Sequence, residues 1–158
     1  FYNHLNTGRP DPDNRIFNRY ASNYLDESNG SLYPFGYGLS YTDFVYGELQ
    51  ISSETLPKNG ELTVSVTVTN KGNYDGYETV QLYLRDIYAE VARPMKELKG
   101  FERIFLKSGE SRDVKFVITK DDLKFYNSEL HYVYEPGEFD VMVGPNSRDV
   151  QTKSFQAE

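Results

Sequence analysis

The most constraining feature of this chain is a strict alternation of apolar and polar residues over positions 61–70. The apolar members are all aliphatic and alternate with hydroxyl-bearing residues: Leu62, Val64, Val66 and Val68 against Thr63, Ser65, Thr67 and Thr69. A period of two places the two kinds of side chain on opposite faces of a β-strand. Turn-forming residues precede and follow the run, at 58–60 and 70–73. The sequence therefore predicts a strand with one buried face and one face in solvent.

Similar runs recur along the chain at near-regular spacing. They lie at 44–51, 77–86, 98–106, 114–118, 139–143 and 150–155, which brings the expected total to about seven strands. Gly, Pro, Glu, Asn and Ser cluster between some of these runs, at 108–110, 135–138 and 144–147. Short alternating strands separated by turns predict an all-β fold, an immunoglobulin-like sandwich of two sheets.

Two stretches depart from the strand pattern. In 120–134, Asp121 is expected to cap a short turn before Leu123, and residues 123–126 are then expected to lie over one open end of the sandwich. Residues 1–42 show no sustained period, yet they carry too many aromatic residues for a disordered linker. We therefore expect an extended connector over residues 1–42 and the sandwich over residues 43–158.

Residues 33–42 combine aromatic rings with glycine and proline. The segment reads Tyr-Pro-Phe-Gly-Tyr-Gly-Leu-Ser-Tyr-Thr, which is unsuited to a helix and too apolar for a solvated loop. Such a segment is expected to pack across another surface, with four docking residues: Tyr33, Phe35, Tyr37 and Tyr41. A platform that stacks sugar rings is the other interpretation. Packing is favoured because exposed sugar platforms commonly rely on Trp, which this chain lacks.

Charge and composition argue against several classes of partner. The formal net charge of the 158 residues is −7, which disfavours nucleic acids and anionic membranes, since both are bound through Lys and Arg. No stretch approaches the roughly 18 consecutive apolar residues of a membrane span. Without Cys, neither disulfides nor thiolate zinc sites can form. The first residues lack an initiator Met and do not resemble a signal peptide, so we expect a chain cut from a longer one.

No catalytic or cofactor-binding residue is expected from the sequence motifs. The two histidines, His4 and His131, lie far apart in the sequence and lack the surroundings of a catalytic triad. Ser40 misses the nucleophile elbow, because Thr42 stands where the second Gly belongs. The segment 36–38, Gly-Tyr-Gly, lacks the third Gly of the dinucleotide fingerprint.

Acidic pairs give no metal or glycosidase site either. Asp11 and Asp13 have the spacing of two calcium ligands, but Arg15 occupies the third position. Glycosidases need carboxyl groups that face each other across a substrate, so the adjacent acids at 26–27 and 121–122 are expected to be solvated or to cap turns. Residues 29–31, Asn-Gly-Ser, match only the weak glycosylation sequon.

Several segments in order resemble the C-terminal region of glycoside hydrolase family 3 enzymes, which are mainly β-glucosidases with some β-xylosidases. The strongest likeness is Leu-Tyr-Pro-Phe-Gly-Tyr-Gly-Leu-Ser-Tyr-Thr at 32–42, similar to the segment that enters the C-terminal domain of those enzymes. The likeness continues through 64–70, 80–86, 93–101, 136–139 and 143–147. Residues 2–10, Tyr-Asn-His-Leu-Asn-Thr-Gly-Arg-Pro, resemble the exit from the second domain in bacterial periplasmic β-glucosidases.

The resemblance implies a fibronectin type III-like sandwich at the end of a three-domain, retaining glycosidase. In that family a barrel domain supplies an Asp nucleophile, and the following α/β domain commonly supplies a Glu acid/base. No position here matches either motif, so no catalytic residue is carried over and no cofactor is implied. The implied partners are the upstream catalytic domains of the same polypeptide, with the carbohydrate substrate bound by the parent enzyme. The implied compartment is periplasmic or secreted.

The leading hypothesis is a non-catalytic accessory domain that packs against the catalytic domains and positions them. The alternative is a carbohydrate-binding module that contacts oligo- or polysaccharide. A protein-interaction module of an unrelated surface protein is a third hypothesis. In the isolated chain, residues 1–42 are expected to lie against the sandwich or to form a homodimer through their exposed aromatic rings.

Overall fold

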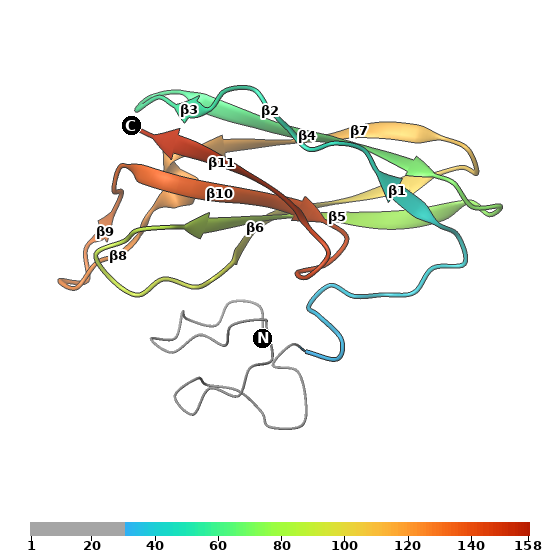
Figure 1. The fold of residues 1–158 in the computed structure, drawn as a ribbon, viewed down its shortest axis with the longest axis horizontal. Coiled ribbons are helices and arrows are strands. Elements are labelled where there is room, and N and C mark those ends of the chain that lie inside the picture. Colours follow the sequence, from blue (N-terminus) through green and yellow to red (C-terminus); the bar gives the residue numbers. More distant parts are fainter. Residues whose placement is uncertain (1–30) are drawn as a thin grey trace, which may run out of the picture.

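Two β-sheets face each other in the computed structural model, which describes residues 31–158 (Figure 1). Residues 1–30 of the expected connector lie outside the described residues. One sheet contains β1 (Phe44–Tyr46), β2 (Gln50–Ile51), β4 (Glu61–Asn70) and β7 (Ser111–Thr119). The other has the order β3 (Thr55–Leu56), β11 (Gln151–Ala157), β10 (Gly137–Gly144), β5 (Gly76–Asp86) and β6 (Glu97–Leu106). The predicted all-β sandwich is confirmed.

A short hairpin and a single helical turn complete the described part of the chain. The hairpin is formed by β8 (Phe125–Tyr126) and β9 (Tyr132–Val133), and the turn is the 3₁₀ helix η1 (Lys120–Leu123). Both lie at one end of the sandwich (Figure 1). No helix of residues 31–158 is long and apolar enough to cross a membrane.

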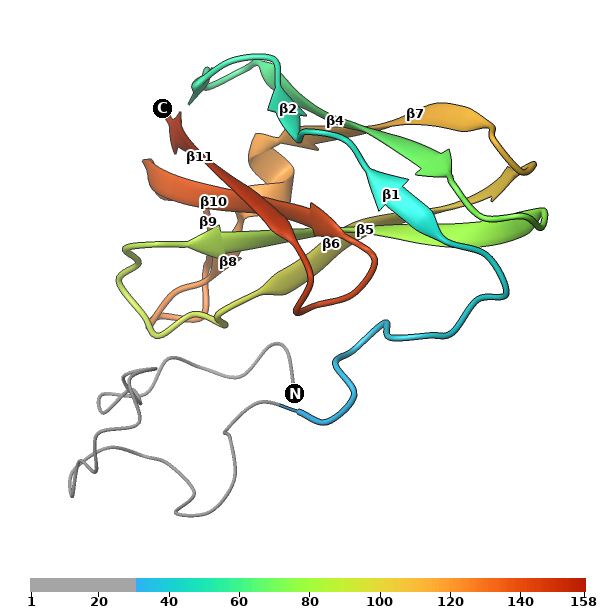
Figure 2. The same cartoon turned by 45° about the vertical axis from the view of Figure 1, so that its right-hand side comes forward.

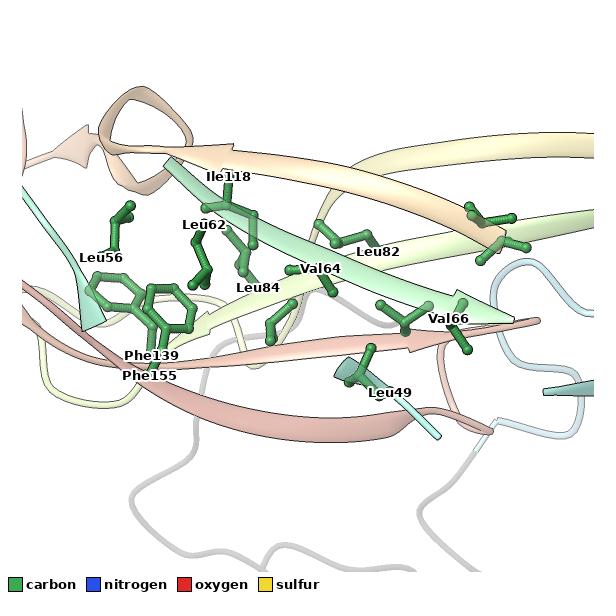
Figure 3. Packing of buried hydrophobic residues seen from close by; sticks show 14 of the residues in the cluster. Leu49, Leu56, Leu62, Val64, Val66, Leu82, Leu84, Ile118, Phe139 and Phe155 are labelled. Carbon is green, nitrogen blue, oxygen red and sulfur yellow. The ribbon is translucent and has the colours of Figure 1, made fainter. Parts of the chain in front are cut away.

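The alternating run at 61–70 forms β4 with the predicted boundaries. It pairs along its whole length with β7 in antiparallel register, from Glu61 opposite Thr119 to Thr69 opposite Ser111. Its four aliphatic side chains are buried, and Figure 3 shows Leu62, Val64 and Val66 in the space between the sheets. The hydroxyl-bearing side chains take the other face, where Thr67 Oγ1 donates to Asp113 Oδ1 at 2.6 Å.

The core between the sheets is aliphatic along most of its length and aromatic at one end. Phe139 of β10 and Phe155 of β11 stack with their ring centroids 5.8 Å apart (Figure 3). Both are almost completely buried, and they belong to one continuous cluster with the inward side chains of β4, β5 and β7. The inward side chains of β10 and β5 are all buried: Phe139, Val141, Val143, Val80, Leu82 and Leu84.

The strand expected at 44–51 is divided into β1 and β2. Tyr46 lies opposite Val68, whereas Gln50 lies opposite Ser65, so the first strand has one extra residue between the two pairs, as in a β-bulge. The Gln151 side chain of β11 holds this bulge, donating to Gly47 O at 2.6 Å and accepting from Leu49 N at 2.9 Å. Hydrophobic periodicity alone could not locate a bulge that a side chain of the other sheet stabilises.

The cap of η1 differs from the expected one. Thr119 is the N-cap, and the Asp122 carboxylate accepts hydrogen bonds from Thr119 N at 2.8 Å and Thr119 Oγ1 at 2.9 Å. Asp121, the expected cap, instead pairs with Lys124, whose hydrogen bond lowers the pKa of Asp121. The expectation that Asp121 caps this turn was therefore wrong: the helix begins directly after Thr119, and the carboxylate that bonds to the cap residue belongs to Asp122. Leu123 is buried in the core cluster.

A half-buried polar pair joins the two sheets at the end of β1. Tyr46 Oη donates to Glu78 Oε1 of β5 at 2.7 Å. Burial raises the pKa of Tyr46 far above its usual value, and burial also raises the pKa of Glu78. This hydrogen bond gives the tyrosine hydroxyl a partner between the two sheets.

Candidate docking surface

Residues 33–42, called the strip below, contain a tight turn at 34–37. Tyr37 N donates to Pro34 O at 3.0 Å, and Gly36 has a φ of +79°. Glycine suits the third position of a type II turn because that position requires a positive φ. A Cβ at Gly36 would overlap with the side-chain amide of Gln81. The turn therefore fits directly onto the outer face of β5.

The backbone of this turn is fixed to the loop between β10 and β11. Ser147 N donates to Phe35 O at 2.9 Å. Gln81 Nε2 donates to Pro145 O at 2.7 Å, so β5, the loop and the turn meet at one point. Lys96 Nζ donates to Ser147 O, and burial lowers the pKa of this amine.

The loop that receives the turn has its own internal bonds. Asn146 Oδ1 accepts from Arg148 N and Asp149 N, each at 2.9 Å, while Asn146 Nδ2 donates to Asp149 Oδ2 at 2.9 Å. The last of these bonds lowers the pKa of Asp149. These internal hydrogen bonds fix the conformation of the loop to which the turn is bonded.

A second anchor fixes the end of the strip at Thr42. Thr42 Oγ1 donates to Asn70 Oδ1 at 2.6 Å, and both residues are buried. Between the two anchors, Ser40 lies close to Gly76, at the beginning of β5. The strip thus follows β5 from Gln81 back towards its first residue and then enters β1, as the two views show (Figure 1, Figure 2).

The four rings of the strip are exposed to different degrees. The exposed fractions are 69% for Tyr33, 49% for Phe35, 42% for Tyr37 and 96% for Tyr41. The rings of Tyr33 and Tyr37 lie together, with centroids 5.4 Å apart, across the turn. The structure therefore places the four predicted docking residues on one anchored segment and brings two of their rings into contact.

Sequence reasoning missed a second row of exposed apolar residues on the same face. The row consists of Phe101 and Phe105 on β6 with Tyr77 on β5. The sequence did contain an indication of this row, because the run 98–106 has apolar residues at odd as well as even positions. A strand of that kind has two faces to cover, and Ile104 and Leu106 already fill the inner one.

The turn is expected to depend on the absence of a side chain at Gly36. Gly36→Ala would place a Cβ against Gln81 at a positive φ, which costs about 1–3 kcal/mol. We expect the amides of Tyr37 and Ser147 to exchange about tenfold faster or more, as followed by NMR. Gly38→Ala is the matched control, because a Cβ at Gly38 meets nothing within 4 Å. Equal exchange in the two variants would contradict the anchoring of the turn on β5.

The other candidate residues do not assemble into a reactive site within residues 31–158. His131 is exposed and its Nδ1 lies 3.4 Å from Glu129 Oε2. Ser40 Oγ accepts a 3.3 Å bond from Thr42 N. His4, the acids of 11–13 and 26–27, and Asn29 and Gly30 of the sequon lie outside the described residues. No group of three or more His, Asp or Glu side chains suited to a metal ion occurs in the described part.

A hollow of about 450 Å³ lies at the end of β5, lined by residues 85–95. Arg93, one of the lining residues, forms two ion pairs: Nη1 donates to Asp86 Oδ2 at 3.1 Å, and Nη2 donates to Glu97 Oε1 at 2.9 Å. Burial raises the pKa of Asp86, whereas hydrogen bonds from Lys99 and Arg93 lower the pKa of Glu97 despite its burial. The guanidinium also lies 4.5 Å from the Phe125 ring centroid, so Arg93 ties the β8–β9 hairpin to the sheet.

Comparison with known proteins identifies the sandwich. Residues 78–147 match the family model of the fibronectin type III-like domain. A periplasmic β-glucosidase of Salmonella typhimurium is 49% identical over 157 residues, which cover 99% of this chain and 20% of that protein. A putative β-xylosidase of Formosa agariphila is 47% identical over 137 residues, covering 87% of this chain and 18% of that protein. The chain thus spans about a fifth of the length of these relatives.

Solved structures agree with these relatives. A β-glucosidase from Listeria innocua, crystallised with laminaribiose, has a TM-score of 0.90 and 43% identity, and the match covers 100% of this chain and 22% of that one. A glycoside hydrolase family 3 β-glucosidase from Bifidobacterium adolescentis has a TM-score of 0.72 and 37% identity over 79% of this chain and 18% of that one. The chain therefore belongs with the fibronectin type III-like domains, in the form found within β-glucosidases and β-xylosidases of glycoside hydrolase family 3.

Proposed function

We propose that this chain is a non-catalytic accessory domain of a β-glucosidase-like glycoside hydrolase, and that it packs against the catalytic domains and positions them. The observation that carries the proposal is the combination of a fixed backbone and exposed rings in the strip 33–42. Hydrogen bonds at Phe35 and Thr42 fix the backbone, while Tyr33 and Tyr41 remain largely exposed. A segment built in this way presents a rigid apolar surface to something outside the sandwich.

The share of each relative that the chain spans supports the same role. The matches cover 16–22% of the longer β-glucosidases and β-xylosidases considered above and of others like them, so about four-fifths of such an enzyme lies outside the matched region. We propose residues 1–42 as the connector to that remainder and residues 43–158 as the sandwich. A periplasmic or secreted location follows the name of the Salmonella relative.

A domain of this kind would affect the reaction through geometry. A retaining glycosidase must hold its two carboxyl groups about 5–5.5 Å apart. Where two domains supply those groups, a small change in the relative placement of the domains moves the reacting atoms out of position, and misplacement by about 1 Å can cost about a hundredfold in rate. An accessory domain that packs against both of these catalytic domains restricts that movement.

The test compares two pairs of exposed tyrosines in the full-length enzyme. The first variant combines Tyr33→Ser and Tyr37→Ser, whose rings are in contact on the strip. The second, a matched control, combines Tyr126→Ser and Tyr132→Ser, whose rings are 5.0 Å apart on the β8–β9 hairpin. We expect the strip variant alone to lower kcat for an aryl glucoside about tenfold and to separate the thermal unfolding of the sandwich from that of the rest.

Three results would decide against the proposal. The first is an unchanged kcat and a single unfolding transition in the strip variant. The second is saturable binding of cello-oligosaccharides to the isolated chain that is lost in the strip variant, which would favour a carbohydrate-binding module. The third is hydrolysis of an aryl glucoside by the isolated chain at a rate that a point substitution abolishes.

A further inference from the structure

We propose that the docking surface includes the outer row of β6 and β5, and that Arg103 in this row receives a carboxylate of the catalytic part of the same polypeptide. This inference rests on the proposed function and specifies the chemistry of the contact. The outer row consists of Tyr77, Phe101, Arg103 and Phe105.

The outer row is a preformed arrangement of rings around one guanidinium. The Cζ atom of Arg103 lies 3.9 Å from the centroid of the Tyr77 ring. The Phe105 ring contacts the same tyrosine, with centroids 5.0 Å apart and planes inclined by 58°. A guanidinium stacked on an aromatic face loses little further conformational freedom when it binds a carboxylate.

The guanidinium of Arg103 has no carboxylate partner among the described residues. Arg93 and Arg148 have carboxylate partners there, whereas Arg103 has no ion pair and its only described side-chain interaction is the ring of Tyr77. A planar guanidinium can bind both oxygens of a carboxylate at once. Exposed apolar rings on either side would shield such a pair from water when a partner surface covers them.

The strip and the outer row share one face of the sandwich. The side chain of Gln81 contacts the turn at Gly36, and Gln81 lies directly opposite Phe101 in the β5–β6 pairing. Side chains of directly paired residues lie on the same face of a sheet, so Phe101 follows Gln81 on the outer face. One strand spacing, about 4.8 Å, separates β5 from β6. A partner that covers the strip is therefore in reach of Arg103.

The area required for a stable contact also calls for the outer row. At about 200 Å² for a full aromatic side chain, the exposed parts of the four strip rings amount to roughly 500 Å². A stable interface buries about 800 Å² on each side. Two exposed leucines, Leu39 of the strip and Leu32 directly before it, together with the outer row extend the apolar surface beyond that size.

The catalytic part of the same polypeptide is the occupant that the observations favour. The strip leads into residues 1–30, and relatives of this chain are about five times its length, so a large body of protein would be tethered beside this face. The chain has a net charge of −7, which opposes self-association. A cationic group surrounded by rings is then suited to an acidic residue on the tethered neighbour.

Charge reversal in the full-length enzyme tests the role of Arg103. We expect Arg103→Glu to raise the rate of amide exchange in residues 38–41 about tenfold, because like charges across an interface repel. Arg112→Glu on β7 of the opposite sheet is the matched control and should leave that rate unchanged. If the Tyr33→Ser, Tyr37→Ser variant raises exchange and Arg103→Glu does not, this inference fails while the proposed function stands. If neither raises exchange, both fail.

Zero-length cross-linking identifies the partner. Arg103→Lys supplies an amine that a carbodiimide can join to a carboxylate in contact with it, and mass spectrometry of the digested enzyme locates the linked acid. We expect a link from position 103 to an Asp or Glu upstream of Phe1, and none from the amine of an Arg112→Lys control. A link between two copies of the chain, found by mixing isotopically labelled and unlabelled enzyme, would overturn the proposal. So would the lack of any link beyond the sandwich.

Discussion

Replacing Phe139 by alanine is expected to lower the free energy of unfolding of this chain by about 3–5 kcal/mol. The ring is 2% exposed and stacks on Phe155 at 5.8 Å between the centroids. Removing it leaves a cavity at the aromatic end of the core (Figure 3), where β-sheet hydrogen bonds hold β10 and β11 in place and restrict collapse. Urea unfolding followed by circular dichroism would measure the change.

Val117→Ala is the control for this substitution. Val117 lies on the outer face of β7 and is 53% exposed, so its truncation is expected to change the free energy of unfolding by about 0.5 kcal/mol or less. Similar losses for the two variants would contradict the assignment of Phe139 to a tightly packed core. A loss of less than about 1.5 kcal/mol for Phe139→Ala would have the same meaning.

The sequence is sufficient to predict the sandwich because most of its long strands carry apolar residues at alternate positions, which indicates a buried inner face. In β4 the alternation is uninterrupted, and the predicted boundaries match those observed. The strands β3, β8 and β9 were not predicted. Each is only two residues long, which is too short for an alternation of apolar and polar residues to be visible. Their positions depend on partners far along the chain, such as the parallel pairing of β3 with β11.

The candidate site shows the same division between local and distant causes. Proline, glycine and four rings in ten residues predict an irregular segment that packs, and the turn at Gly36 agrees with that composition. No local pattern specifies that the segment is held by Ser147 and Gln81, which are distant in sequence. The outer row containing Arg103 was missed for a related reason, since the cross-strand contact with Tyr77 depends on the register of β5 and β6.

The strip and the sandwich are joined at one buried side chain, Asn70. Its amide lies where the strip, the end of β4 and the turns beside it converge. Asn70 Oδ1 accepts from Thr42 Oγ1 at 2.6 Å and Gly72 N at 3.1 Å, and Asn70 Nδ2 donates to Tyr74 O at 2.8 Å and Leu106 O at 3.1 Å. These four bonds use the full capacity of the side chain. A change at Asn70 therefore affects both the stability of the sandwich and the anchorage of the strip.

Asn70→Ala is expected to lower the free energy of unfolding by about 3–5 kcal/mol, because four hydrogen bonds of about 1 kcal/mol each are lost and buried carbonyl groups are left without donors. Thr42→Val removes one of those bonds and is expected to cost only about 1 kcal/mol. Urea unfolding of the two variants measures both values, and amide exchange at residues 38–41 reports release of the strip. Equal costs for the two variants would contradict a central role for Asn70.

Asn70→Asp separates the hydrogen-bond donors of Asn70 from its acceptors. The carboxylate keeps the bonds from Thr42 and Gly72 but faces the carbonyl oxygens of Tyr74 and Leu106 without a donor. Burial would raise the pKa of the new carboxyl above its value in the unfolded chain, so the folded state binds the proton more tightly. The free energy of unfolding relative to wild type should therefore rise as the pH falls through that raised pKa. A pH-independent difference between pH 7 and pH 4 would show that the two donors do not matter.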